Sequence, residues 1–236
     1  MDISSKLAIL DQIYSIYDKF ISTLDVICKK YCAHCCTINV TLTTLEGYKI
    51  IEGLMTRGKS DVLKKIQAAS GEKGFQPKTT TNQLAALCAE GIEPPAEQAG
   101  EEGKKCPFLF ENQCSIYELR PFGCRCLISR NNCGQTGYAE VDDFVLSVNT
   151  VFLQTIENVD FHGCTGNLAH VLCRMMFKNN RRAYQKGALQ CSDLGLICNH
   201  PLRVLMIPPE HRTKIKPILQ KLREIRVYFT RKNASS

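Results

Sequence analysis

The stretch CKKYCAHCC, residues 28–36, places four cysteines within nine positions. A second stretch, CPFLFENQCSIYELRPFGCRCLISRNNC at residues 106–133, carries five more. A metal held by thiols from both stretches would close a long loop and tie the intervening helices together. We therefore expect these two segments to decide how the chain folds.

The whole chain has 236 residues and 14 cysteines. Its first twenty residues, MDISSKLAILDQIYSIYDKF, lack the basic and apolar regions of a secretory signal, and no apolar run is long enough to span a membrane. We expect a cytoplasmic protein. Disulfides rarely persist in a reducing cytosol, so this density of cysteines favours metal or redox chemistry. The alternative is that many of the cysteines are small buried hydrophobic residues.

Apolar residues make up 44% of the chain, which is enough for a hydrophobic core. Their helical spacing predicts amphipathic helices, one of them opened by a capping box from Thr43 to Glu46 and another capped by Ser60. The first predicted helix, residues 5–27, would run directly into Cys28. The others cover residues 43–57, 61–69, 81–90, 141–158, 166–178 and a basic stretch ending near 228.

The rest of the chain predicts little regular structure. Gly91 to Lys105 is rich in Pro, Gly and Glu and predicts an exposed loop, while LFENQCSIY predicts a small hairpin. Ser115 is expected to cap one helical turn that Pro121 stops. Since strands and helices do not alternate, we predict a mainly α fold whose helices pack around a cysteine-rich, metal-pinned loop region with at most a short hairpin.

We divide the chain into a metal-binding domain, residues 1–140, and a helical C-terminal region, residues 141–236, packed on the same core. The net charge is +7, and its excess lies towards the C-terminus in RTKIKPILQKLREIRVYFTRK. This basic helix could bind a protein substrate or another acidic partner, although a solvated helix face is the more usual explanation. We expect no membrane and no nucleic-acid partner.

Four thiolates suit both zinc and iron–sulfur clusters. A structural zinc site usually shows two clean C-x2-C pairs, whereas this chain has a surplus of cysteines, an adjacent Cys35–Cys36 pair and irregular spacing. The pattern favours a cluster, or two sites, over one structural zinc. Four nearby cations would favour thiolate over thiol: Lys29, Lys30, Arg120 and Arg125.

The series CKKYCAHCC, CPFL and CSIYELRPFGCR resembles the CxxCxxCC family of "putative zinc- or iron-chelating" domains, with one additional residue in the first gap. That family shares its cysteine domain with the flagellin lysine N-methylases. The resemblance covers residues 28–36 and 106–133, and leaves residues 1–27 and 140–236 unassigned. It implies eight metal ligands: Cys28, Cys32, Cys35, Cys36, Cys106, Cys114, Cys124 and Cys133.

The surrounding motif is matched by Tyr117, Arg120, Pro121 and Arg125. The two arginines either pair with carboxylates and cover the site, or donate hydrogen bonds to cluster sulfurs or to a substrate carboxylate. The resemblance further implies a 4Fe-4S cluster or zinc, and a metal-dependent modifying enzyme of the protein lysine N-methylase type that uses S-adenosylmethionine. The alternative is a non-enzymatic structural or redox protein. No catalytic residue is indicated.

The remaining cysteines are expected to serve packing. Cys88 shares a helical face with Leu84 and Leu87 and is predicted to be in the core, and Cys126 is predicted to point away from the site. A second metal site, with His162 and His200 beside two of the thiols, is the alternative for the last group: Cys164, Cys173, Cys191 and Cys198.

Two short patterns are weaker. Residues 28–35 have the C-x3-C-x2-C spacing of radical-SAM enzymes, but they follow a predicted helix and not the first strand of a barrel. GLMTRGKS, Gly53 to Ser60, fits the phosphate-loop pattern with Lys59 as its lysine. We favour a helix that ends at Gly58 followed by a Ser60 cap, and keep nucleotide binding as the weakest alternative. No hydrolytic triad is evident.

Overall fold

The computed structural model describes residues 1–28, 31–69, 71, 74–98, 104–192 and 195–234. Within these residues the mainly helical class predicted from the sequence is confirmed. The longer helices are α1 (Ile3–Ile21), α2 (Thr44–Thr56), α3 (Ser60–Ala69), α4 (Thr81–Ala89), α7 (Asp143–Val159), α8 (Leu168–Met176), α9 (Lys178–Gln185) and α10 (Lys216–Ala234). Within the described chain, no helix is both long enough and apolar enough to cross a membrane.

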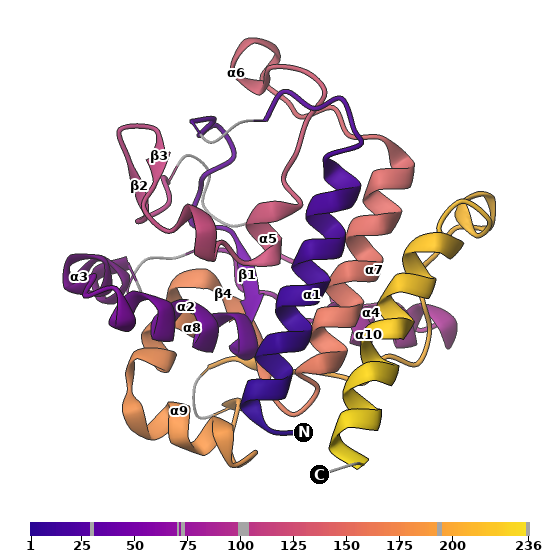
Figure 1. Cartoon of the computed structure of the whole chain (residues 1–236). Helices are drawn as coiled ribbons and strands as arrows, with labels where there is room; N and C mark the ends of the chain where they lie inside the picture. The colour runs from indigo at the N-terminus through magenta and orange to yellow at the C-terminus, as the bar shows by residue number, and fades with distance from the viewer. Residues whose placement is uncertain (29–30, 70, 72–73, 99–103, 193–194, 235–236) are drawn as a thin grey trace.

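The long helices form a scaffold to one side of the cysteine-rich segments. α1 packs against α7 and α10, and α2 packs against α8 (Figure 1). The cysteine-bearing elements lie at the opposite end of the molecule from the two termini (Figure 1): the hairpin of β2 (Leu109–Phe110) and β3 (Gln113–Cys114), α5 (Phe122–Arg125) and α6 (Cys133–Thr136). Helices from both sides of residue 140 share one cluster of buried hydrophobic side chains, and the domain boundary proposed there stays a prediction.

An aromatic cluster joins the scaffold to the cysteine-rich region. Tyr17 of α1 packs edge-on against Phe122 of α5, with ring centroids 4.6 Å apart, and against Phe152 of α7 at 5.0 Å. Phe122 and Phe152 stack at 5.6 Å. All three side chains are fully buried, and such contacts stabilise a core beyond the area they bury. The short helix α5 is therefore anchored in the core through its first residue.

The sequence analysis predicted at most a short hairpin, but the structure also contains a separate small antiparallel sheet. It has the order β1–β4–β5, formed by β1 (Thr41–Thr43), β4 (Cys164–Asn167) and β5 (Ile197–Cys198). Leu42 pairs with Gly166, and Cys164 pairs with Cys198. These strands are only two to four residues long. Segments this short show no period-2 alternation, so their pairing is visible only in the tertiary structure.

Some predicted boundaries were wrong. α1 ends at Ile21 and does not run to Cys28, because the chain turns at residues 22–24 and the amide of Ile27 then donates to the carbonyl of Ser129 at 3.0 Å. The predicted Ser115 cap is also wrong. Its hydroxyl donates to the carbonyl of Phe108 at 2.9 Å, and the helical turn η1 (Tyr117–Leu119) has no side-chain cap.

The connection from α2 to α3 excludes the phosphate-loop alternative. Gly53 lies inside α2, and Gly58 (φ 63°) ends the helix. The amides of Arg57, Gly58 and Lys59 donate to carbonyls of the last helical turn, so they do not form a cradle of free N–H groups. The interpretation of a helix that ends at Gly58 is confirmed. Its Ser60 cap lies outside the described side chains.

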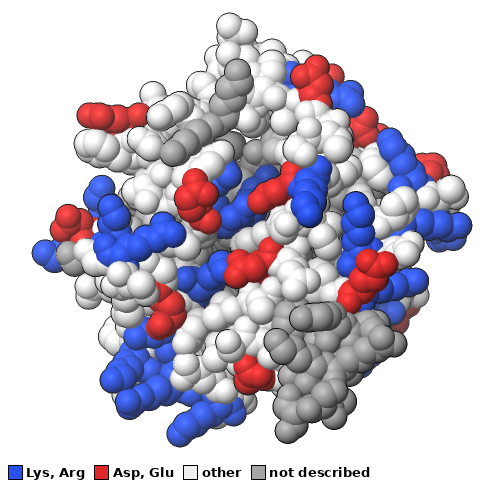
Figure 2. All heavy atoms as spheres, in the orientation of Figure 1, with Lys and Arg blue, Asp and Glu red and all other residues white. Residues whose placement is uncertain are grey.

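The basic residues are spread over more than the C-terminal helix. α9, which the sequence analysis did not predict, carries Lys178, Arg181 and Arg182, and Figure 2 shows lysines and arginines gathered over this corner of the molecule. On α10, Lys216, Lys221 and Arg223 are exposed while Leu222 and Ile225 face the core. This agrees with a solvated helix face, and an acidic partner for it stays a prediction.

Glu46 is a buried carboxylate that joins three elements. The predicted capping box is confirmed: the amide of Thr43 donates to Oε2 of Glu46 at 2.9 Å. Oε1 accepts hydrogen bonds from the hydroxyl of Tyr14 in α1 at 2.7 Å and from the amide of Phe122 in α5 at 2.6 Å. One side chain thus satisfies donors from α1, α5 and the start of α2.

We expect Glu46→Gln to lower the free energy of unfolding by about 1–3 kcal/mol, because an amide nitrogen would face a buried donor whichever way the group turned. Denaturant unfolding measures the change. The matched control is Glu90→Gln, where the glutamate is exposed and the expected change is within about 0.5 kcal/mol. Equal stability of the two variants would contradict this role for Glu46.

Cys164 and Cys191 form a disulfide, which corrects the expectation that these thiols stay reduced and pack independently. Both residues are buried, and the bond ties β4 to the segment before β5 across 27 residues. A cross-link of this span stabilises the fold mainly by restricting the unfolded chain. It also removes two thiols from the second metal site considered for this region.

We expect a phosphine reductant to lower the free energy of unfolding of the wild-type chain by about 3–4 kcal/mol through loss of this bond. The control is the double variant Cys164→Ala/Cys191→Ala, whose stability should not respond to the reductant. Thermal unfolding of both proteins with and without reductant measures the effect. A wild-type transition that the reductant leaves in place would show that the bond does not contribute.

Candidate metal centre

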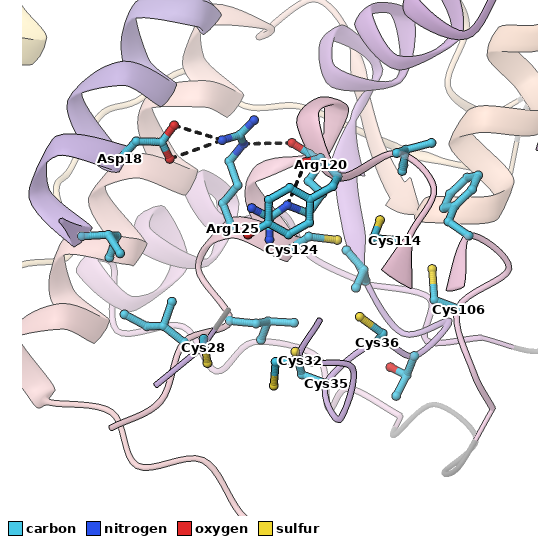
Figure 3. A pocket seen from close by; sticks show the side chains of 18 of the residues that line it. Asp18, Cys28, Cys32, Cys35, Cys36, Cys106, Cys114, Arg120, Cys124 and Arg125 are labelled. Carbon is cyan, nitrogen blue, oxygen red and sulfur yellow. Dashed lines mark hydrogen bonds and ion pairs between the residues drawn. The ribbon is translucent and has the colours of Figure 1, made fainter. Parts of the chain in front are cut away.

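Seven of the eight predicted ligands line one cavity of about 320 Å³. They come from three separate segments, and Figure 3 shows their sulfurs distributed around a common space. The cavity also has an apolar wall that includes Ile21, Val26 and Ile128. The lining cysteines are Cys28, Cys32, Cys35, Cys36, Cys106, Cys114 and Cys124. The eighth, Cys133, is not among the lining residues, but its thiol lies near enough to Cys28 to act on it electrostatically.

Backbone hydrogen bonds bring the two cysteine-rich stretches together. The amide of Cys106 donates to the carbonyl of Cys36 at 2.9 Å, and Thr37 forms a bridge with Lys105 beside it. In the predicted hairpin, which is confirmed, Cys114 pairs with Leu109, and the amide of Leu109 donates to the carbonyl of Cys106 at 3.0 Å. The hairpin turns tightly at Glu111 and Asn112, both at positive φ.

Cys124 lies on α5, and contacts with α2 and β1 fix the position of this short helix. The Phe122 amide binds the Glu46 carboxylate, as described above. Gly123 approaches β1 so closely that a Cβ at this position would lie 2.6 Å from the carbonyl oxygen of Thr41. Only a glycine permits this contact without displacing backbone. Sequence reasoning missed both Glu46 and Gly123 as residues of the site. The glycine next to Cys124 could have indicated a close backbone contact, but the sequence did not show that its partner is Thr41.

Arg125 pairs with a carboxylate, as one of the two interpretations had it. Its Nη1 lies 3.1 Å from Oδ2 of Asp18 (Figure 3). Its guanidinium also lies over the ring of Tyr14, 4.3 Å from the ring centroid. Its Nε donates to the carbonyl of Arg120 at 3.0 Å. Asp18, which the sequence did not single out, therefore holds Arg125 at the edge of the cavity.

Arg120 is oriented differently. Its guanidinium stacks on the ring of Tyr117 at 3.5 Å, and its Nε donates to the Tyr117 carbonyl at 2.9 Å. Among the described residues no carboxylate forms an ion pair with it, and it lines the cavity beside Cys124 (Figure 3). This cation faces the thiols, and their pKa values respond to it. Lys29 and Lys30, the other predicted cations, lie outside the described residues.

Burial shifts the pKa of several thiols of the cavity upward. It raises the pKa of Cys106 to about 11, and it raises the pKa of Cys28, Cys114 and Cys124 as well. The Arg120 guanidinium partly offsets this rise in the pKa of Cys114 and Cys124. A hydrogen bond from the Cys35 thiol lowers the pKa of Cys36 and raises that of Cys35.

The donors fit a thiolate-bound metal or cluster by their chemistry. Among the described residues, however, no three His, Cys, Asp or Glu side chains are close enough to hold an ion in this arrangement. Metal binding would therefore draw the sulfurs together. The loop that carries residues 31–36 has turns and no helix or strand, so it can make this adjustment at lower cost than the helical scaffold.

The remaining cysteines lie away from the cavity. Cys126 points away, as predicted, and its thiol donates to the carbonyl of Gly123 at 3.6 Å. Cys88 is exposed on α4, so its predicted core position is wrong; the buried face of that helix is formed by Asn82 and Ala85. Cys198 is exposed and Cys173 is half-buried.

The histidines offered for a second site do not build one among the described residues. The ring of His162 packs on Phe161 at 3.7 Å, and Nδ1 of His200 lies 3.5 Å from the hydroxyl of Thr80. With Cys164 and Cys191 in a disulfide, the alternative of a second metal site in this region is not formed by the described residues.

A protein that gathers seven cysteine side chains around one cavity has the site of a thiolate metal-binding protein. Residues 27–139 match the family model CxxCxxCC, described as a "putative zinc- or iron-chelating domain". This part of the chain is therefore a CxxCxxCC domain, as the resemblance indicated. Comparisons with curated proteins and with solved structures gave no match. That the eight cysteines act as ligands stays a prediction.

We expect zinc binding to the metal-free chain to release protons, because the buried thiols have raised pKa values and must ionise to coordinate. The apparent affinity for zinc should therefore rise with pH between pH 6 and 8. Titration calorimetry in two buffers of different ionisation enthalpy counts the protons released. An affinity that does not change with pH would contradict thiol coordination.

Proposed function

We propose that this chain is a cysteine-ligated metal protein and that its cavity binds iron–sulfur. The observation that carries the proposal is the convergence of Cys36, Cys106 and Cys124 on one cavity, from segments that are seventy residues apart in sequence. Such a convergence has an entropic cost without a ligand, because it closes a long loop. Metal binding offsets that cost.

Iron–sulfur is favoured over a single structural zinc by three features of the site. The number of thiols exceeds the four that one zinc ion takes. The cavity keeps room beyond the sulfurs. Arg120 faces the thiols without a described carboxylate partner, and a cation there would balance the negative charge of a thiolate-bound cluster. Zinc in the same thiols is the alternative.

The cavity also supports a second candidate, a metal-dependent modifying enzyme of the protein lysine N-methylase type that uses S-adenosylmethionine. The specific observation is that apolar side chains line the cavity alongside the thiols, and such a lining suits a small molecule next to the metal. The competing candidate is a non-enzymatic structural or redox protein with every ligand position filled. Calorimetric titration of the metal-loaded chain with S-adenosylmethionine separates the two candidates. Binding supports the enzyme, and no binding supports the non-enzymatic protein.

We expect anaerobically purified protein to contain iron and acid-labile sulfide and to absorb visible light as iron–sulfur proteins do. Cys124→Ser and Cys35→Ser should each lose a large share of the metal. Cys88→Ser, whose thiol is exposed on α4 and far from the cavity lining, is the matched control and should keep it. If the protein instead contains stoichiometric zinc and no sulfide, the centre is a zinc site and the iron–sulfur proposal is wrong. Equal metal content in all three variants would overturn the site.

A further inference from the structure

The eight predicted ligands fall into two groups of four. The first cysteine stretch lies against the segment that carries Cys133, because the Ile27 amide donates to the Ser129 carbonyl at 3.0 Å and the ring of His34 lies against Gly134. Cys36 lies instead beside Cys106, whose amide donates to the Cys36 carbonyl at 2.9 Å. Figure 3 shows the same division: Cys28, Cys32 and Cys35 lie together on one side, and the other four labelled thiols lie on the opposite side. We name the two sets the outer group and the inner group.

The inner group, Cys36, Cys106, Cys114 and Cys124, is held by backbone contacts to its neighbours. The hydrogen bond from Cys106 to Cys36 and the β2–β3 pairing fix three of its backbones relative to one another. Cys124 follows from α5, which the Glu46 carboxylate and the Thr41–Gly123 contact hold against the scaffold. Each member is thus attached to the core through its own backbone.

The outer group, Cys28, Cys32, Cys35 and Cys133, depends on a different contact. Ile27 donates to Ser129, and the segment after Ser129 is closed by a hydrogen bond from the Arg130 amide to the Glu140 carbonyl at 2.9 Å. The ring of His34 lies against Gly134, where a Cβ would come within 2.3 Å of Nε2. The loop of residues 31–36 therefore lies on the segment that carries Cys133 through contacts that the inner group does not share.

The two groups meet at Cys35 and Cys36, whose thiols are hydrogen bonded. One adjacent pair of residues can supply a ligand to each of two neighbouring centres. A single four-ligand metal or cluster would leave four of these eight thiols without a metal. The double cysteine and the second set of four have a role if both sets bind metal.

We propose that the domain holds two thiolate centres: an inner centre on Cys36, Cys106, Cys114 and Cys124, and an outer centre on Cys28, Cys32, Cys35 and Cys133. This inference rests on the proposed function, because it divides the thiols of the same metal-binding region. The inner centre is fixed to the scaffold. The outer centre lies on loops and includes the exposed Cys35, so it exchanges its metal more readily.

The test is a titration of the metal-free full-length chain with Co²⁺ under anaerobic conditions, because thiolate-bound cobalt absorbs in the near ultraviolet and visible. We expect the wild-type chain to bind two equivalents with tetrahedral thiolate spectra. Cys133→Ser and Cys114→Ser should each bind one equivalent, and the double variant should bind less than half an equivalent. A chelator should remove the cobalt in two phases, with the faster phase absent in Cys133→Ser.

Controls separate this inference from a folding defect and from the proposed function. Cys88→Ser should bind two equivalents, and circular dichroism reports whether each variant keeps its helices. Should Cys114→Ser fail to fold, Cys133→Ser, whose cysteine begins the short helix α6 outside the hydrophobic cluster, still decides the question. Saturation of the wild-type chain at one equivalent would overturn the two-centre inference and leave the proposed function intact, as would loss of both equivalents in Cys133→Ser. A chain that bound no cobalt would overturn both.

Discussion

The buried carboxylate of Glu46 is the group on which the placement of the cysteines depends most. It sits at the first turn of α2, and its two oxygens accept hydrogen bonds from Thr43, Tyr14 and Phe122. Two of these donors belong to other elements, α1 and α5. Because a buried carboxylate is stable only when its oxygens are satisfied, the three elements have to keep this arrangement. Cys124 and the contact between Gly123 and β1 follow from it.

The architecture separates a rigid part from an adaptable part. The helices share one hydrophobic cluster that includes the aromatic rings of Tyr17, Phe122 and Phe152, whereas most of the thiols are carried by loops, a two-stranded hairpin and single helical turns. Irregular backbone lets thiols from distant segments point into one space, which a straight helix cannot do. The scaffold then limits how far those segments can separate when no metal is bound.

The two arginines of the motif illustrate how neighbouring residues of one type take different roles. Arg125 is engaged by Asp18, Tyr14 and the carbonyl of Arg120, so it closes the edge of the cavity next to α1. Arg120 stacks on Tyr117 and faces the thiols. The motif placed both residues near the metal-binding region, but the sequence could not assign these roles. Each role depends on which side chains lie against the arginine in the folded chain, and for Arg125 these come from the distant helix α1.

Residue spacing by itself determined much of this protein: the mainly helical class, the capping box of α2, the small hairpin, the helix end at Gly58 and the CxxCxxCC domain of residues 27–139. Each of these depends on residues within a few positions of one another, where periodicity, caps and turns act directly. The tertiary structure alone decided the sheet β1–β4–β5, the pairing of Cys164 with Cys191, the exposure of Cys88 and the exit of the chain from α1 at Ile21. These features join segments far apart in sequence, and a local pattern carries no information about which distant segment will satisfy a strand edge, a thiol or a loop amide. The division of the thiols into two groups is of the same kind, because it follows from which backbone segments the scaffold brings together.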